Sequence, residues 1–283
     1  MMSNDIKDLS CEEFFDKCLG IAEETNRIPA DAFENYRIKR GLREPDGTGV
    51  VVGATRICSV RGYVIEDGDR IPAPGQLIYR GYNVEDLIHG FMREGRFGYE
   101  ETAYLLLFGS LPTKEQLDTF HDLLVRCRTL PAGFTEDMIL KAPSSDVMNK
   151  LARATLSLYS YDDDPENNSL EYELLQAVQL IARYPVIVAH AFACKRHYFD
   201  NESLYLHRPN EHLSVAENFL YSIRPNNQFT EEEARLLDLC LVLHMEHGGG
   251  NNSAFTCRVL SSTGTDIYSA IAAAVGSLKG PKH

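Results

Sequence analysis

The feature that most constrains this chain is the helical spacing of its apolar residues, which continues with few interruptions from Asn83 to the C-terminus. Apolar residues recur there at i, i+3 and i+4, the spacing of one face of an α-helix. Three segments open with a capping box, a Ser or Thr followed three residues later by Glu or Gln: Thr113–Gln116, Ser214–Glu217 and Thr230–Glu233. Because such boxes begin helices, we predict a mainly α protein of about ten helices.

Strand character is confined to residues 50–80. Two short segments rich in β-branched residues, Thr55–Val60 and Gly62–Ile65, precede Asp67-Gly68, a dipeptide typical of a two-residue hairpin turn. A further strand is expected at Gln76–Tyr79. We therefore expect a small β element here, in which Arg61–Pro74 forms a surface hairpin.

The β element divides the chain into three parts. Residues 1–49 are an N-terminal segment, residues 50–80 the β element and residues 83–283 the helical core. In the first part, Ser10 and Glu13 have the form of a capping box, which predicts a helix over about residues 10–24.

The longest apolar segment, Ser169–Arg196, contains Pro185, so we expect a kink there or two helices. The acidic run Asp162–Asp164 precedes this segment and is interpreted as a solvated loop. A calcium site is the alternative, although the Gly and the distal Glu of a calcium-binding loop are missing.

Composition excludes several classes of function. The formal net charge of -13 argues against a nucleic-acid-binding surface, which requires clustered Lys and Arg. No apolar run reaches the roughly 18 residues of a membrane span, and the acidic N-terminus does not resemble a signal peptide. The seven cysteines are scattered without a Cys-x-x-Cys pair, which is typical of reduced, mostly buried thiols. We expect a cytoplasmic protein with no nucleic acid or membrane partner.

Two histidines and three glycines lie together near the C-terminus. Helical spacing places His244 and His247 on one face of the helix that begins at Glu231. The pair is consistent with one core histidine and one cap, or with a metal site that lacks an evident third ligand, because Glu246 lies on another face. The glycines Gly248–Gly250 exceed what a helix C-cap requires, and they would let backbone N–H groups approach an anionic ligand.

The last predicted helix begins at Thr265 or Asp266 and is ended by Gly280-Pro281. One face carries apolar residues, and the opposite face carries small ones. The small residues are Ala270, Ala273, Ala274 and Ser277. Such a face suits close helix packing, including packing across a dimer interface.

Several of these motifs together resemble one family. The first is His247-Gly248-Gly249-Gly250-Asn251-Asn252-Ser253, and it is followed by Arg258, Ser262, Asp266–Ile271 and Leu278–His283. Two earlier segments agree in order and spacing, Leu77–Leu87 and Phe97–Pro112. Over about residues 25–283 the chain resembles citrate synthase and its relative 2-methylcitrate synthase. The resemblance implies the mainly α fold of the multi-helical large domain, with a small N-terminal β element.

The resemblance also implies a reaction. The family condenses an acyl-CoA with a 2-oxo acid, usually acetyl-CoA with oxaloacetate, and then hydrolyses the citryl thioester. By position, His283 resembles the histidine that donates a hydrogen bond to the thioester oxygen, where negative charge develops. Ser253 resembles the hydroxyl that orients this histidine, and His247, together with Asn251, falls at the oxaloacetate-binding positions. The family implies a homodimer, no cofactor beyond acetyl-CoA or propionyl-CoA as substrate, and no metal.

The chain departs from the family in one respect. The family's second catalytic histidine, its aspartate base and its oxaloacetate-binding arginines all follow the position of His283. We therefore expect residues 1–283 to be an incomplete large domain with the small domain missing, inactive by itself. The alternatives are a 2-methylcitrate synthase that uses propionyl-CoA, a non-catalytic truncated paralogue that acts as a dimerising or regulatory subunit, and a metalloenzyme that uses His244 and His247.

Overall fold

The computed structural model describes residues 31, 35, 41–44, 49–50, 52–281 and 283, in two compact units, Met1–Val50 and Val51–His283. The helix predicted over residues 10–24 lies outside the described residues. In the first unit, Arg43 and Gly49 form an isolated antiparallel bridge. All the predicted site residues belong to the second unit.

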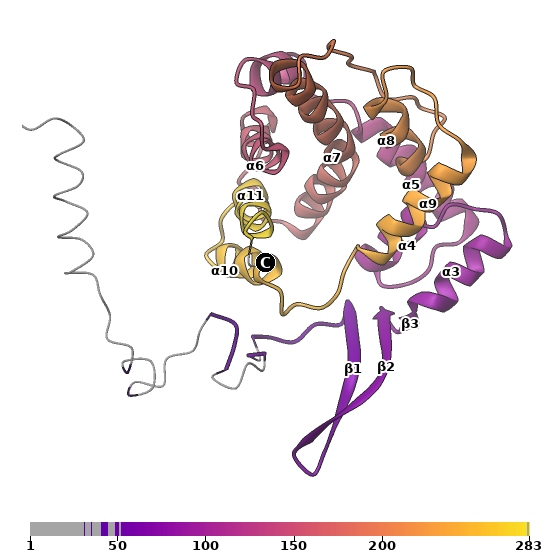
Figure 1. The fold of residues 1–283 in the computed structure, drawn as a ribbon, viewed down its shortest axis with the longest axis vertical. Coiled ribbons are helices and arrows are strands. Elements are labelled where there is room, and N and C mark those ends of the chain that lie inside the picture. The colour runs from indigo at the N-terminus through magenta and orange to yellow at the C-terminus, as the bar shows by residue number, and fades with distance from the viewer. Residues whose placement is uncertain (1–30, 32–34, 36–40, 45–48, 51, 282) are drawn as a thin grey trace, which may run out of the picture. The chain divides into compact units, whose positions relative to one another are not determined.

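A long hairpin and one short strand form the β element (Figure 1). The three strands are β1 (Cys58–Glu66), β2 (Asp69–Tyr79) and β3 (Tyr82–Asn83), antiparallel and in the order β1-β2-β3. Asp67 and Gly68 have φ angles of 52° and 91°, as a two-residue turn with positive φ at both central positions requires. The predicted surface hairpin is thus confirmed.

The hairpin differs from the sequence prediction in one detail. The two short strands expected at residues 55–60 and 62–65 are a single strand, with a register irregularity between Arg61 and Tyr63. Arg61 pairs with Gln76 and Tyr63 pairs with Pro72, so β2 has two more residues than β1 across this step. The irregularity is therefore a bulge on β2, opposite Gly62.

Helices make up most of the second unit, as predicted (Figure 1). The predicted capping boxes form at Thr113, Ser214 and Thr230. The side chain of Asn83 caps the helix that begins at Val84. The bounds are α3 Val84–Arg93, α4 Tyr99–Phe108, α5 Lys114–Cys127, the π-helix η2 Thr135–Leu140, α6 Val147–Leu158, the 3-10 turn η3 Tyr159–Tyr161, α7 Leu170–Phe199, α8 Val215–Ile223, α9 Glu231–Leu243, α10 Asn252–Ser261 and α11 Ile267–Leu278.

Helix α7 is the central element of the core. It is one continuous helix of 30 residues that contains Pro185, so the expectation of two helices there is wrong. It packs against α5, α6 and α8, and Ile187 and Cys194 are fully buried in the cluster that it shares with α6 and α11. By length and composition α7 could cross a membrane, but 44% of its apolar window is buried inside the protein. The helix continues through Pro185 although the proline removes one backbone hydrogen bond.

A second cluster joins the hairpin to the helices. Tyr79, at the end of β2, is completely buried among residues of α3, α4 and α9. Its hydroxyl donates to Val242 O at 2.9 Å, across 163 positions of sequence. Burial raises the pKa of Tyr79 to about 12, so the hydroxyl remains a proton donor. This contact fixes the end of α9, where the predicted site begins.

The acidic run before α7 is not simply a solvated loop. Asp162 is partly buried and accepts hydrogen bonds from the hydroxyls of Tyr172 and Tyr268, both at 2.6 Å, and from Gln176 Nε2 at 2.9 Å. Burial alone would raise the pKa of Asp162, but these hydrogen bonds hold it below its ordinary value. Asp162 therefore joins α7 to α11, whereas Asp163 and Asp164 are exposed as expected.

The five cysteines of the described region are free thiols. Cys58 and Cys194 are buried, Cys127 and Cys257 are half-buried, and Cys240 is exposed. The described cysteines agree with the prediction of reduced thiols. The prediction that most of them are buried is correct only for Cys58 and Cys194 among the described cysteines.

Candidate functional site

Helix α9 ends between the two histidines that sequence spacing placed on one helix face. Its last residue is Leu243, and His244 is the C-cap, with Nδ1 2.7 Å from Cys240 O. His247 lies beyond the helix, so the predicted common face for His244 and His247 is wrong. The helix ends before His247 because the side chain of Tyr79, from β2, interrupts its hydrogen bonds. The Tyr79 hydroxyl donates to Val242 O and accepts from Glu246 N at 3.4 Å, in place of the helical bond between these two groups.

The loop after α9 is held by the side chain of Glu246. Glu246 Oε1 accepts from the backbone N–H groups of His247 at 3.1 Å and of Gly248 at 2.6 Å. Gly248 has a φ of 101°, which a residue with a Cβ rarely adopts. One amide of the predicted anion-binding glycines is therefore already occupied by a carboxylate of the chain itself.

The four predicted site residues lie in one continuous chain of hydrogen bonds. Asn251 Nδ2 is 3.2 Å from His247 Nε2. Ser253 Oγ is 2.7 Å from Asn251 Oδ1 and 3.1 Å from His283 Nε2. The two histidines are exposed, so both rings can reach a ligand from solvent. The structure thus brings together side chains that are separated by up to 36 positions of sequence, His247 and His283.

Helix α10 positions the middle of this chain, and sequence reasoning did not predict it. Asn251 is its N-cap, with Oδ1 accepting from the Ala254 N–H at 2.7 Å. The apolar periodicity of α10 is weak, and none of its residues is buried. The Asn at position 251 is the sequence signal that could have located the start of the helix.

A turn after α11 places the last residue of the site. Asp266 caps α11 as expected, accepting from Ser269 N at 2.8 Å. The His283 N–H donates to Gly280 O at 3.0 Å, in the turn that the sequence predicted beyond the helix. Ala270, which the sequence assigned to a small face suited to dimer contacts, is buried within this chain.

Arg258 supplies a positive charge beside the glycine loop. Its Nη2 donates to Gly249 O at 2.9 Å, and a side chain on Gly53 would come within 2.6 Å of its Nη1. Within the described residues, no carboxylate forms an ion pair with Arg258. Arg258 belongs to the motifs that resemble the family, but the sequence alone assigned it no function. Its contacts show that the glycines permit close approach of a guanidinium group.

Metal ligands are not assembled at this site in the part of the chain that the structure describes. No group of three or more His, Cys, Asp or Glu side chains there is arranged to hold a metal ion. Nδ1 of His244 is bound to a backbone carbonyl, and Nε2 of His247 faces an amide donor. Both rings are thus engaged with the protein itself.

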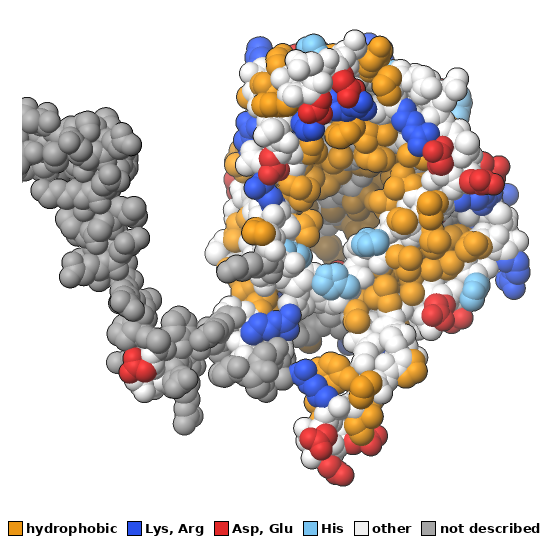
Figure 2. Space-filling model, viewed as in Figure 1, with side chains coloured by type: hydrophobic (Ala, Val, Ile, Leu, Met, Phe, Trp, Pro, Cys, Tyr) orange, Lys and Arg blue, Asp and Glu red, His pale blue; other side chains and the backbone are white. Residues whose placement is uncertain are grey.

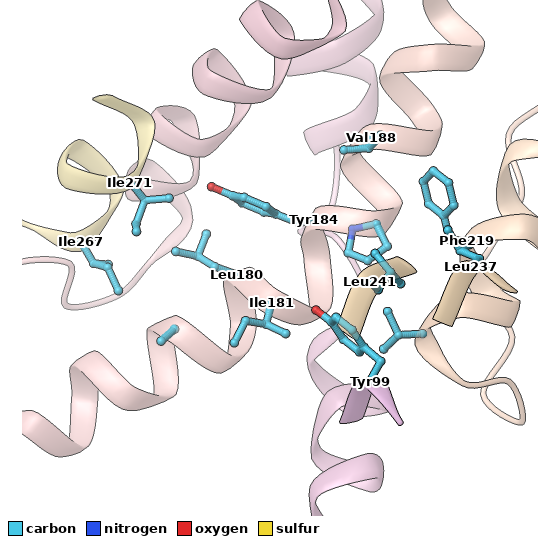
Figure 3. Close-up of a pocket in the computed structure, with 13 residues that line it drawn as sticks. Tyr99, Leu180, Ile181, Tyr184, Val188, Phe219, Leu237, Leu241, Ile267 and Ile271 are labelled. Atoms are coloured by element: carbon cyan, nitrogen blue, oxygen red, sulfur yellow. The ribbon is translucent and has the colours of Figure 1, made fainter. Parts of the chain in front are cut away.

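A separate apolar cavity of about 490 Å³ lies among the helices (Figure 3). Tyr99, Tyr184 and Phe219 line it together with aliphatic residues of α7, α9 and α11. Burial raises the pKa of Tyr99 and of Tyr184 to about 12, so both phenols are neutral at physiological pH. None of the four predicted site residues lines the cavity, so it is distinct from the histidine site.

The fold and site together define a mainly α protein with a histidine- and glycine-rich site at the C-terminal end of the described chain. The family profile "Citrate synthase, C-terminal domain" matches residues 43–283. The chain is 36% identical over 251 residues to a citrate synthase of Haloferax volcanii and 34% identical over 252 residues to 2-methylcitrate synthase 1 of Corynebacterium glutamicum. It therefore belongs to the citrate synthase family.

Solved structures agree with this assignment. The crystal structure of citrate synthase from Pyrobaculum aerophilum matches with a TM-score of 0.70 and 30% identity, over 87% of this chain and 59% of that one. Each of the two curated relatives is matched over 87% of this chain. The chain spans 58% of the length of each of them.

Proposed function

We propose that this chain carries the acyl-thioester side of a citrate synthase-type active site, for the condensation of acetyl-CoA with oxaloacetate through an enolate of the thioester. The observation that carries the proposal is the hydrogen-bonded chain of His247, Asn251, Ser253 and His283, in a member of this family. The family resemblance assigns substrate contacts to His247, Asn251 and His283, and assigns to Ser253 the orientation of His283.

In this proposal, His283 is the group that faces the thioester oxygen. Loss of a methyl proton moves charge onto that oxygen, and a positioned hydrogen-bond donor stabilises the charge as it develops. Ser253 holds the ring through Nε2, so Nδ1 is the nitrogen left to contact the thioester. His247 and Asn251 bind the 2-oxo acid, and Arg258 adds positive charge that favours a dianion near the glycine loop.

A solved relative supports this choice of ligands. The Thermoplasma acidophilum citrate synthase structure is described as a ternary complex with carboxymethyl coenzyme A and oxaloacetate, and it matches this chain with a TM-score of 0.67 and 26% identity. Relatives of both substrate classes match this chain to similar degrees, so propionyl-CoA, the substrate of a 2-methylcitrate synthase, is the alternative acyl donor.

The 283 residues by themselves are proposed to bind ligand without turnover. Proton abstraction needs a base near the acyl methyl group. In this proposal the two imidazoles bind the thioester oxygen and the 2-oxo acid, and the amide and the hydroxyl are not bases, so none of the four site residues is left to take the methyl proton. We therefore propose that the aspartate base and the second catalytic histidine of the family are required in addition to these residues.

The test is calorimetric titration of the 283-residue chain with carboxymethyl coenzyme A in the presence of oxaloacetate. We expect measurable binding that weakens at least tenfold in His283→Ala, which corresponds to about 1.4 kcal/mol. His89→Ala is the matched control, because His89 is exposed on α3, away from these residues, and should bind as the parent does. The proposal is wrong if neither chain binds the analogue, or if His283→Ala binds it equally well.

Turnover is measured in parallel by the release of free CoA thiol from acetyl-CoA and from propionyl-CoA. We expect none above background from the 283-residue chain with either substrate. Release that His283→Ala abolishes would show that these residues hold a complete active site. It would contradict the requirement for further groups, and the preferred thioester would decide between the two substrates.

A further inference from the structure

The orientation of the Asn251 amide is fixed by the helix that it caps. A backbone N–H can only donate, and the Ala254 N–H lies 2.7 Å from Asn251 Oδ1. That atom is therefore the amide oxygen, and the other terminal atom is the NH₂ group. Asn251 Nδ2 lies 3.2 Å from His247 Nε2 and can only donate to it. Nε2 of His247 is therefore the unprotonated nitrogen, and neutral His247 carries its proton on Nδ1.

The same oxygen determines the direction of the Ser253 hydroxyl. Asn251 Oδ1 only accepts, so the hydrogen bond of 2.7 Å between it and Ser253 uses the single proton of the serine. Toward His283, Ser253 Oγ then presents a lone pair. Nε2 of His283, 3.1 Å away, must therefore be the donor and carry a proton.

We propose that Asn251 is a positioning residue that sets the tautomers of both histidines, with the proton on Nδ1 in His247 and on Nε2 in His283. In this state, neutral His283 has a lone pair on Nδ1, the nitrogen that does not contact Ser253. It can accept a hydrogen bond there but cannot donate one.

This inference rests on the proposed function where it concerns catalysis. A histidine that donates through Nδ1 to a thioester oxygen needs the other tautomer. The structure provides a route to it in which atoms and charge balance. The Ser253 hydroxyl rotates from Asn251 Oδ1 toward His283 Nε2, the Nε2 proton leaves to solvent, and solvent returns one proton to Nδ1. The resting site is thus held in a form that does not polarise the thioester until this one hydroxyl rotates.

The test is long-range ¹H–¹⁵N NMR of the histidine rings in the 283-residue chain, which separates protonated from unprotonated ring nitrogens. Spectra are recorded at a pH about two units above the ordinary histidine pKa of about 6.5, so that neutral rings are observed. Nine histidines contribute, and the signals that disappear in His283→Ala and His247→Ala assign the two of interest. We expect Nε2–H for His283 and Nδ1–H for His247.

Substitutions at Asn251 and Ser253 separate the two effects. Asn251→Asp keeps an acceptor for Ala254 and Ser253 but removes the donor to His247. His283 should keep Nε2–H, while His247 should move its proton to Nε2 to donate to the carboxylate. Ser253→Ala should release His283 to a mixture of tautomers and leave His247 unchanged. Asn252→Ala, next to the cap, should change neither ring.

Two outcomes would overturn the inference. One is a parent chain in which neutral His283 carries its proton mainly on Nδ1. The other is an Asn251→Asp chain, shown to be folded by circular dichroism, in which His247 does not change. The NMR experiment uses no substrate, so its failure is distinguishable from the failure of carboxymethyl coenzyme A to bind.

Discussion

Glu100 connects three helices through one carboxylate. It lies on α4, where Oε2 is 2.9 Å from His121 Nδ1 on α5 and Oε1 accepts from the Val215 N–H, at the start of α8, at 3.1 Å. The hydrogen bond to Glu100 raises the pKa of His121 above its ordinary value, while burial acts in the opposite direction. Folding therefore favours the protonated imidazole relative to the unfolded chain.

This residue gives the stability of the chain a predicted pH dependence. A histidine whose pKa is raised on folding stabilises the protein fully below its unfolded pKa, about 6.5, and the contribution is lost as pH rises through the higher folded value. His121→Gln should therefore lower the free energy of unfolding at acidic pH, by up to about 1 kcal/mol because the pair is partly exposed, and this loss should disappear as pH rises past the raised folded pKa. Urea denaturation of both chains across this range measures the difference. A difference that grows with pH would contradict the assignment.

Helix α4 shows how a cap can come from a distant element. Its own N-cap residue is Gly98, which has no side chain to accept a hydrogen bond. Asp238 of α9 takes this role, accepting from the Gly98 N–H at 2.6 Å and from the Tyr99 N–H at 3.1 Å. Asp238 and Gly98 are buried, so the Gly98 N–H has no other protein partner when Asp238 is removed.

Asp238→Ala should therefore destabilise the chain by about 1–3 kcal/mol, the range expected when buried donors lose their partner. Urea denaturation measures the loss, and hydrogen exchange should be faster at the amides of Gly98 and Tyr99. Asp238→Asn is the matched control, because it keeps one oxygen acceptor and should lose less. Equal stability of the Ala variant and the parent would show that α4 does not depend on this cap.

The contrast between local caps and caps from distant elements explains which helix ends the sequence could predict. Capping boxes such as Thr230–Glu233 act within one turn, so sequence alone located the starts of the helices that have such boxes. The hairpin turn at Asp67-Gly68 is local in the same way. Tyr79, which ends α9, and Asp238, which caps α4, act across more than 130 positions, and no local pattern reveals them. The site residues were found through the family motif, whereas their hydrogen-bond order depends on α10, which has no strong apolar face.

At the scale of the whole molecule, the apolar cavity of about 490 Å³ between α4, α7, α8, α9 and α11 is a departure from close packing (Figures 2 and 3). Apolar side chains surround the hollow visible in Figure 2. Protein interiors are normally packed to the density of organic crystals, so side chains at a gap of this size lack contacts that they would otherwise make. Ala177 of α7 is a small residue at this surface.

Ala177→Leu should therefore stabilise the chain, by about 0.5–2 kcal/mol, because the added atoms enter existing apolar space. Ala193→Leu, on the same helix but outside the cavity lining, is the control for an added Leu on α7. It should be neutral or destabilising, since extra methylene groups in a packed region force neighbours to move. Thermal unfolding of the two variants and the parent measures both effects. Loss of stability in Ala177→Leu comparable to that in Ala193→Leu would mean that the helices already close over this space in solution.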